Sequence, residues 1–276
     1  MASSIYTMQG LSFAYREHGA RRARRHGAAR AGEGVTPVFS GLDLAIPEGV
    51  VTTLIGANGS GKSTLFNLMT KNLTPDEGRV FLRRGDVSLM RLRDFSRLVA
   101  IVHQHNTAPA DLAVGSLVGY GRNPHHTMAA AASTEEDERM VAWALKTAGL
   151  AGLEDRPVAS LSGGQRQRAW IAMALAQGTQ VLLLDEPTTY LDVRYQIETL
   201  RLVRRLNEEF GITVVMVLHD INQALAYSDH IVALADGCVA AQGAPEEVIT
   251  PQTVREVYHI DLELTHVHGH PFVIAV

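Results

Sequence analysis

The chain has 276 residues, of which 46% are apolar, and a formal net charge of −4 at pH 7. The apolar share supports a sizeable core, and the small negative charge gives no general basic character that would favour nucleic acid. The single cysteine, Cys238, excludes an intramolecular disulfide and is in keeping with a reducing compartment. No apolar run reaches the roughly 18–20 residues of a membrane-spanning helix, and the N-terminus does not resemble a signal peptide. We therefore expect the chain to stay where it is made, and any membrane-spanning helices to come from a partner.

The N-terminal part predicts strands interrupted by a basic segment. Residues 3–15 alternate loosely between apolar and polar types, which predicts an edge strand. Residues 16–34 are basic and rich in Ala and Gly, which predicts a loop insertion. This loop could contact anionic lipid headgroups, and the simpler interpretation is a solvated loop. Apolar runs at 42–46 and 50–55 predict two further strands.

Helical spacing replaces strand alternation between about 88 and 160. It occurs at 91–98, 113–120 and 135–150, and prolines separate these segments. From residue 165 onward we expect helix 164–177, strand 181–184, helix 193–210, strand 213–218, helix 221–228 and strand 231–235. This alternation predicts an α/β fold with a mostly parallel sheet that helices cover on both faces.

A phosphate-binding loop is predicted between the strand at 50–55 and the helical pattern that begins at Leu65. Residues 56–64 read GANGSGKST, which matches the G-x-x-x-x-G-K-[ST] loop of nucleotide triphosphatases. A chance match in a glycine-rich turn is the alternative, but average composition predicts only about 0.01 matches in such a chain. Because the backbone N–H groups of such a loop point at an anion, the expected phosphate-binding residues are Gly56, Asn58, Gly59, Ser60, Gly61, Lys62, Ser63 and Thr64.

Charged and hydroxyl side chains around this loop suggest catalysis. Lys62 would supply a positive charge for the β- and γ-phosphates, and the Ser63 hydroxyl is a candidate Mg²⁺ ligand. The apolar run 181–184 ends in Asp185 and Glu186, which places both carboxylates where open α/β sheets bind ligands. Asp185 is a candidate Mg²⁺ ligand through water, and Glu186 a candidate base for an attacking water. A solvated strand end is the alternative, but the upstream P-loop and the following Pro187 favour function.

A second anion-binding helix N-terminus is predicted at residues 162–165. Ser162 is a suitable N-cap, and Gly163 and Gly164 leave the first N–H groups of a strong helix uncovered. Gln165 is the fourth residue of this predicted anion-binding segment. A capped helix after a glycine turn explains Ser162 and Gly163, but it does not explain a second phosphate-type site in one chain.

These motifs together resemble the nucleotide-binding subunits of ABC transporters. An LSGGQ segment at 161–165 follows the P-loop and precedes the Asp185-Glu186 strand, and the resemblance covers about residues 5–250. It implies a RecA-like P-loop NTPase fold with an inserted helical subdomain and an antiparallel N-terminal part, and ATP hydrolysis with ATP and Mg²⁺ as cofactors. The implied single ABC ATPase domain has a core over 1–87 and 165–250, a helical and signature subdomain over 88–164, the basic insertion and a C-terminal extension over 251–276.

The resemblance also implies roles for residues outside the P-loop. Gln104 matches the Q-loop glutamine, a ligand of Mg²⁺ and water, although His103 stands where the family more often has Pro. Asp192 in Leu191-Asp192 matches the D-loop, and His219 matches the switch histidine that contacts the γ-phosphate. Tyr15 matches the aromatic residue that stacks on adenine. The expected catalytic residues are thus Glu186, His219 and Lys62.

A dimer and membrane partners follow from the resemblance. In the family, the LSGGQ helix faces the P-loop of a second copy, so that two ATP molecules lie between the copies. We therefore expect a homodimer that ATP closes and hydrolysis opens. We also expect an integral membrane permease, a substrate-binding protein that acts through the permease, no nucleic acid, and a peripheral location on the cytoplasmic face of the cell membrane.

Finer resemblance narrows the class to importers. Segments 185–192 and 218–224 are similar to the ATPase subunits of bacterial ferric-siderophore importers, as are 118–125 and 242–248. The alternatives are a haem or cobalamin importer ATPase, and a soluble ABC ATPase that acts on ribosomes or DNA. Ribosome-acting members usually carry two cassettes and DNA-repair members a long coiled coil, and this chain has neither. An exporter half would need a fused or separate membrane part.

Two groups of histidines lie outside these motifs. The C-terminal group could bind a metal if alternate residues of a strand share one face, and an exposed polar strand edge is the simpler interpretation; it comprises His259, His266, His268 and His270. The other group is expected at the surface and in contact with the permease, and comprises His103, His105, His125 and His126.

Overall fold

A computed structural model describes residues 3–16, 35–126, 134–267 and 270–274 of the chain. The predicted basic insertion at 16–34 lies outside the described residues apart from Arg16, and so does His268. Among the helices of this described part, none is both long and apolar enough to cross a membrane.

The main sheet has six strands in the order β10-β9-β3-β8-β7-β6. Strands β3 (Val51–Gly56), β7 (Val181–Leu184) and β8 (Thr213–Val217) form its centre, and all of their residues are buried. Such fully buried strands are typical of a parallel sheet that is covered on both faces. Strands β6 (Val99–Val102) and β9 (His230–Ala235) extend the parallel part, and β10 (Cys238–Gly243) joins antiparallel to β9.

A smaller antiparallel sheet contains the N-terminal strands in the order β2-β1-β4-β5. Its members are β1 (Ser4–Arg16), β2 (Val35–Pro47), β4 (Glu77–Leu82) and β5 (Gly85–Asp86). The prediction of an edge strand at 3–15 was wrong, because β1 pairs with β2 on one side and with β4 on the other. Its loose alternation reflects one buried face and register shifts along both pairings.

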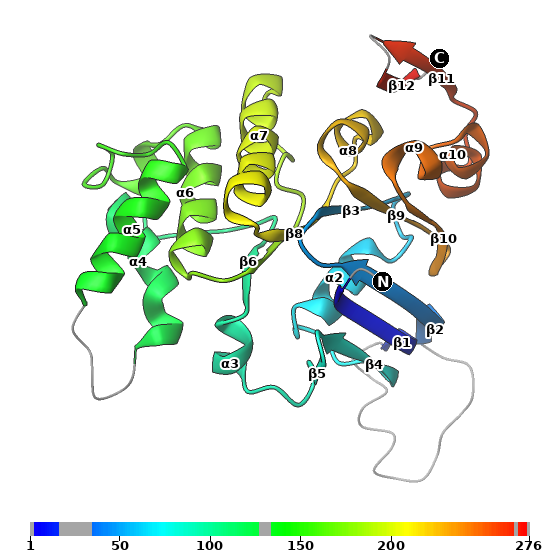
Figure 1. Cartoon of the computed structure of the whole chain (residues 1–276), viewed down its shortest axis with the longest axis horizontal. Helices are drawn as coiled ribbons and strands as arrows, with labels where there is room; N and C mark the ends of the chain where they lie inside the picture. The colour runs from blue at the N-terminus through cyan, green and yellow to red at the C-terminus, as the bar shows by residue number, and fades with distance from the viewer. Residues whose placement is uncertain (1–2, 17–34, 127–133, 268–269, 275–276) are drawn as a thin grey trace.

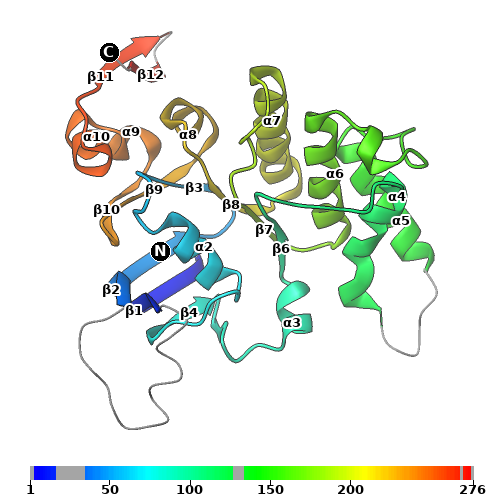
Figure 2. The same ribbon diagram turned by 180° about the vertical axis from the view of Figure 1, so that it is seen from behind.

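Helices α4 (Val114–Gly119), α5 (Glu135–Thr147) and α6 (Gly163–Ala176) gather at one end of the molecule beside β6 of the main sheet, and the smaller antiparallel sheet lies away from them (Figures 1 and 2). Short segments α3 (Leu92–Ser96), η2 (Tyr120–His125) and η3 (Val158–Ser160) complete this region. The expected helical and signature subdomain at 88–164 also contains a strand that the sequence did not predict, since β6 within it pairs with β7 in the main sheet. A four-residue apolar run flanked by helical patterns does not show the strand period clearly.

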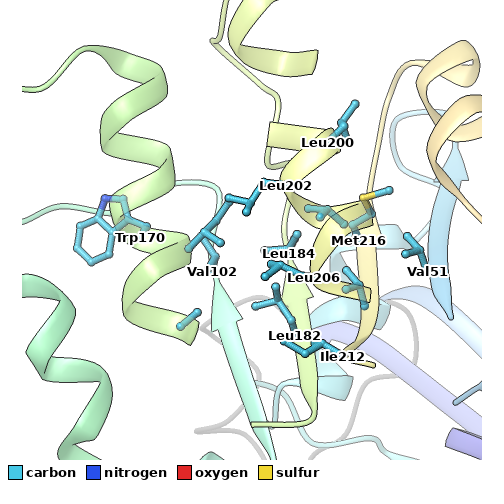
Figure 3. Packing of buried hydrophobic residues seen from close by; sticks show 14 of the residues in the cluster. Val51, Val102, Trp170, Leu182, Leu184, Leu200, Leu202, Leu206, Ile212 and Met216 are labelled. Carbon is cyan, nitrogen blue, oxygen red and sulfur yellow. The ribbon is translucent and has the colours of Figure 1, made fainter. Parts of the chain in front are cut away.

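Helix α7 (Val193–Phe210) lies against the main sheet and the helical group, and its buried face contributes to a large apolar core. Figure 3 shows Leu200, Leu202 and Leu206 of α7 packed beside Leu182 and Leu184 of β7. The chain ends with α8 (Ile221–Tyr227), α9 (Pro245–Val248), α10 (Pro251–Tyr258) and a hairpin of β11 (Glu263–Val267) and β12 (His270–Ile274). Helix α2 (Lys62–Met69) follows β3 directly and starts the functional site.

Candidate nucleotide site

The predicted phosphate-binding loop connects β3 to α2. Two of its glycines, Gly56 and Gly61, have close neighbours: Gly61 has a φ of 103°, and a Cβ atom there would lie 2.8 Å from the ring of Phe39. Only glycine therefore fits this position. Within the loop, Asn58, Gly59 and Ser63 are exposed, whereas Gly56, Ser60, Gly61, Lys62 and Thr64 are buried. The loop thus has the strand-to-helix setting that the sequence predicted.

Lys62 is almost fully buried and folds back over the loop. Its Nζ atom donates to the carbonyl oxygens of Gly56 at 2.7 Å and Ala57 at 2.8 Å. Burial lowers the pKa of Lys62, and the negative charge of Glu186 partly opposes that shift. Because its two hydrogen-bond partners are neutral carbonyl groups, the ammonium charge remains available to an anion.

Tyr15 lies beside this loop in spite of its distance in the sequence. Its hydroxyl is 3.2 Å from the Oγ1 atom of Thr64, and its ring meets Phe13 edge-on at 5.1 Å. With 48% of its surface exposed, the ring is accessible to a flat partner. The stacking of Tyr15 on adenine stays a prediction that this position favours.

The side chain of Glu186 lies at the centre of a set of polar contacts after β7. One carboxylate oxygen is 2.6 Å from Nε2 of His219. The other oxygen accepts hydrogen bonds from Gln104 at 2.5 Å and from the Thr189 hydroxyl at 3.0 Å. The structure therefore brings three of the predicted residues together. Thr189 was missed in the sequence, where a hydroxyl three residues after a carboxylate was the available signal.

Asp185 lies next to Glu186 and is partly buried. Its backbone N–H donates to the carbonyl of Val102 at 2.9 Å, which brings the start of the Gln104 loop to the end of β7. The pKa of Asp185 is raised above its usual value by burial and by the charge of Glu186. The charges of His103, His105 and His219 oppose this shift only in part. A divalent cation would favour the ionised form of such a carboxylate.

The segment at 162–165 has the predicted capped helix. The Ser162 hydroxyl accepts from the Gln165 N–H at 3.3 Å, and the Gln165 side chain accepts from the Ser162 N–H at 3.1 Å. This capping box uses neither the N–H of Gly163 nor that of Gly164. A Cβ atom on Gly164 would lie 2.3 Å from the ring of Tyr195, so packing against α7 explains that glycine.

One copy of the chain does not join the two helix N-termini. In the described parts of the chain, no hydrogen bond connects residues 162–165 with residues 56–64. Figures 1 and 2 both show α6 beside α4 and α5 and away from α2. Asp192 also has a local role, because its side chain caps α7 by accepting from the N–H of Tyr195 at 3.2 Å.

The remaining histidines have varied surroundings. His105 is exposed and stacks on Tyr190 at 6.0 Å, and His103 meets Phe66 edge-on at 6.3 Å. His125 and His126 are not simple surface residues, because they bond to Gln177 and Asp137 at 2.8 and 3.0 Å. For the C-terminal histidines, the side chains at 268 and 270 are not described; among the described residues, no cluster of three His, Cys, Asp or Glu could hold a metal ion.

A nucleotide-binding loop joined to a mostly parallel α/β sheet, with a glutamate held beside it, defines the class of P-loop nucleotide triphosphatases. A family model described as ABC transporter matches residues 39–189. The chain is 46% identical over 233 residues to an iron(3+)-hydroxamate import ATP-binding protein of Bacillus subtilis, covering 84% of this chain and 86% of the relative. It is 43% identical over 227 residues to a ferric enterobactin transport ATP-binding protein of Escherichia coli, with coverage of 82% and 83%.

A solved structure of similar fold is a dimeric ATP-binding cassette in a post-hydrolysis state with ADP and phosphate. Its TM-score is 0.70 at 28% identity, and the match covers 87% of this chain and 98% of the other. The chain belongs to the ABC transporter family and is an ATP-hydrolysing subunit of that type. These findings confirm the predicted family, fold class and ATP hydrolysis.

Proposed function

We propose that this chain powers a bacterial importer that takes up an iron–siderophore complex through an integral membrane permease. The cargo is supported by two relatives that are named for ferric hydroxamate and ferric enterobactin and that match more than four fifths of this chain. Both names refer to ferric chelates, which favours this cargo over haem or cobalamin. The chain would lie on the cytoplasmic face of the membrane, and a substrate-binding protein would act through the permease.

The contacts of Glu186 carry the proposed chemistry. The carboxylate is held on one side by His219 at 2.6 Å and on the other by Gln104 at 2.5 Å and Thr189 at 3.0 Å. A carboxylate fixed in this way can accept a proton from a water that attacks the γ-phosphate. His219 would orient the carboxylate and reach the γ-phosphate, and Lys62 would neutralise charge on the phosphates.

The three predicted ligands fit a magnesium ion. Ser63, Gln104 and Asp185 offer hydroxyl, amide and carboxylate oxygens, the oxygen ligands that Mg²⁺ prefers. Gln104 donates its amide nitrogen to Glu186, so its amide oxygen remains available. When bound, Mg²⁺ would neutralise charge on the phosphate oxygens and hold them in place.

Two copies would complete each nucleotide site. The P-loop and the capped helix at Ser162 lie apart in one copy, yet both present free N–H groups at a helix N-terminus. A triphosphate between the P-loop of one copy and residues 162–165 of another would be stabilised by both helix ends. Asp192 would lie at the same interface. ATP would thus close the dimer, and hydrolysis would open it.

Uptake in cells tests this function. A strain that lacks the gene should lose uptake of ⁵⁵Fe-labelled siderophores, and the wild-type chain should restore it. The Glu186→Gln variant should not restore uptake, because ATP hydrolysis would be blocked, whereas Glu209→Gln, an exposed glutamate on α7, should restore it fully. Normal siderophore uptake with loss of haem or cobalamin uptake in the deletion strain would contradict the proposed cargo.

A further inference from the structure

Two glutamine side chains join the turn after β7 to helix α8. Gln196 on α7 donates from Nε2 to the carbonyl oxygen of Leu191 at 2.9 Å. Gln223 on α8 donates from Nε2 to Oε1 of Gln196 at 2.8 Å. The backbone N–H of Gln223 in turn donates to Asp220 at 3.0 Å, within the cap of α8. A chain of hydrogen bonds therefore runs from the turn after Glu186 to the turn after His219.

The backbone fixes the direction of this chain. The carbonyl of Leu191 can only accept, so the amide nitrogen of Gln196 must face it. The amide oxygen of Gln196 then faces Gln223, which must donate. Both amides thus have a single orientation, and the contact has a defined donor and a defined acceptor.

The glutamine pair shares a cavity with the proposed catalytic pair. A cavity of about 140 Å³ is lined by the two glutamines together with Glu186, Thr189, His219 and Asp220. Both glutamines are partly buried, so water competes little for their contact. The glutamines therefore line the same small space as Glu186 and His219.

Glu186 lies in the turn after β7 and His219 in the turn after β8. A contact between these two turns would fix the distance between the two side chains. The first turn is tightly wound, with φ values of 49° at Glu186 and 64° at Tyr190. The second turn leads into a short helix whose outer side is held by Asn222, which exchanges two hydrogen bonds with Val273 of β12 at 3.0 and 2.8 Å. The contact between Gln223 and Gln196 connects that helix to the other turn.

We propose that Gln196 and Gln223 are positioning residues for ATP hydrolysis, which set the separation of Glu186 and His219 through their side-chain contact. The inference rests on the proposed function, since it takes Glu186 and His219 as the reacting pair. Small errors in the position of a general base reduce the rate strongly without weakening substrate binding. The glutamine pair should therefore affect kcat for ATP more than KM.

Replacement of Gln196 and Gln223 by an oppositely charged pair tests this contact. Gln223→Glu places an acceptor against the Gln196 acceptor, and we expect kcat to fall about tenfold with KM for ATP changed less than about twofold. Gln196→Arg alone should be mild, because the amide of Gln223 can turn and accept from the guanidinium. In the double variant the guanidinium can donate both to Leu191 and to the new carboxylate, and kcat should return to within about twofold of wild type.

Controls separate positioning from folding. Gln223→Ala removes the donor without adding charge, so it should lower kcat similarly and should not be rescued by Gln196→Arg. Gln242→Ala removes an exposed glutamine on β10 and should match wild type. Thermal unfolding of each full-length variant should stay close to that of wild type.

Two outcomes would overturn the inference: wild-type turnover by both Gln223 variants, or a double variant as slow as Gln223→Glu alone. Glu186→Gln, measured in the same assay, separates the two proposals. If Glu186→Gln keeps wild-type turnover, the proposed catalytic role itself fails. If Glu186→Gln is inactive while the Gln223 variants are normal, only the positioning role fails.

Discussion

Glu186 adopts a backbone conformation that residues other than glycine rarely take. Its φ is 49°, and such strain costs on the order of 1–3 kcal/mol. His219, Gln104 and Thr189 bind its carboxylate and offset this cost. Strain that neighbouring groups stabilise is typical of functional positions, because it holds a reacting group in place before the substrate arrives.

Replacement of Glu186 by Gln should separate binding from hydrolysis. The amide cannot accept the proton from water, so ATP turnover should fall by at least about a hundredfold, while the P-loop and Lys62 still bind ATP. The measurements are ATP affinity by calorimetry and phosphate release by the purified chain. Lys62→Ala should instead weaken ATP binding itself, because its ammonium would no longer meet the phosphates. Wild-type turnover by Glu186→Gln, or wild-type affinity of Lys62→Ala, would contradict these roles.

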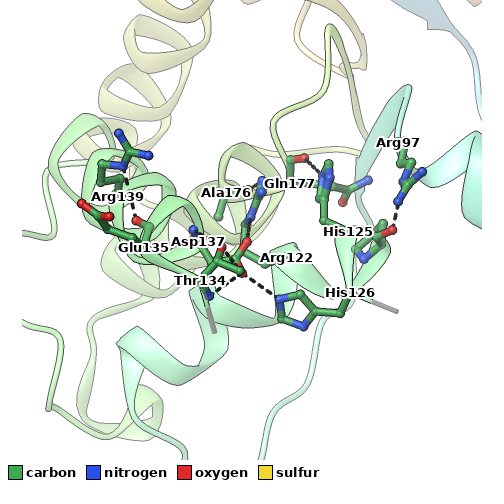
Figure 4. Close-up of polar contacts among 11 residues, drawn as sticks. Arg97, Arg122, His125, His126, Thr134, Glu135, Asp137, Arg139, Ala176 and Gln177 are labelled. Carbon is green, nitrogen blue, oxygen red and sulfur yellow. Dashed lines mark hydrogen bonds and ion pairs between the residues drawn. The ribbon is translucent and has the colours of Figure 1, made fainter. Parts of the chain in front are cut away.

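At the scale of elements, one buried ion pair connects three segments of the helical group. Arg122 of η2 lies 2.7 Å from Asp137 of α5 and donates to the carbonyl of Ala176 at the end of α6 at 2.9 Å (Figure 4). Asp137 also accepts from Thr134 and His126. Burial would raise the pKa of Asp137, but the hydrogen bonds from Arg122, Thr134 and His126 outweigh it and lower that pKa.

Loss of the Asp137 carboxylate should destabilise this group. Asp137→Asn leaves the buried guanidinium of Arg122 without a counter-charge, and the free energy of unfolding should fall by about 3 kcal/mol. Denaturant unfolding followed by circular dichroism measures this change. Glu136→Gln, at the neighbouring exposed position, should change stability little. A loss as small for Asp137→Asn as for Glu136→Gln would contradict the importance of the pair.

The stability that the Arg122–Asp137 pair contributes depends on pH in the acid range. Because the pKa of Asp137 is lower in the folded chain, its stabilisation is fully present above the ordinary value of 3.8 and is lost as pH falls through the folded value. The Asp137→Asn variant should therefore lose less stability than wild type over that acid range.

At the scale of the whole molecule, each copy has two separate helix N-termini that we propose to bind phosphate, and a second copy would be needed for both to meet one nucleotide. Gly163 lies at the exposed start of α6, and a Cβ atom there would have only an ordinary contact, 3.7 Å from Leu191. Side chains can thus be added at this position without disturbing the fold of one copy.

Gly163→Asp should block the ATP-dependent dimer. A carboxylate at a helix N-terminus stabilises the helix, but it would repel the terminal phosphate of ATP bound to the other copy. Gly163→Asn has nearly the same shape without the charge and is the matched control. With ATP and Glu186→Gln as background, size-exclusion chromatography should show dimers for Gly163→Asn and monomers for Gly163→Asp. Equal dimer formation by both variants would argue against a phosphate at this helix end.

Much of the fold could be predicted from local pattern. The helix at 193–210 and the strand at 181–184 agree with the structure, because a long amphipathic period and a short apolar run with clear ends are local signals. The central position of β1 and the membership of β6 in the main sheet could not be predicted, because pairing depends on strands distant in the sequence. Gln104, Glu186 and His219 were found by motif, whereas the contacts of Thr189, Gln196 and Gln223 required the structure.

The order of residues along the chain determines the phosphate loop, the two carboxylates after a buried strand and the capped glycine helix, because each depends on neighbours within a few positions. Tertiary structure alone decides which of these groups meet. Parallel strands bring their carboxyl ends to one edge of the sheet, so that Gln104 and His219 both come within hydrogen-bond distance of Glu186, although 82 and 33 residues separate them from it in the sequence. It also keeps the helix at Ser162 away from the loop at Lys62, since packing of α6 against α4 and α5 fixes its place in the molecule.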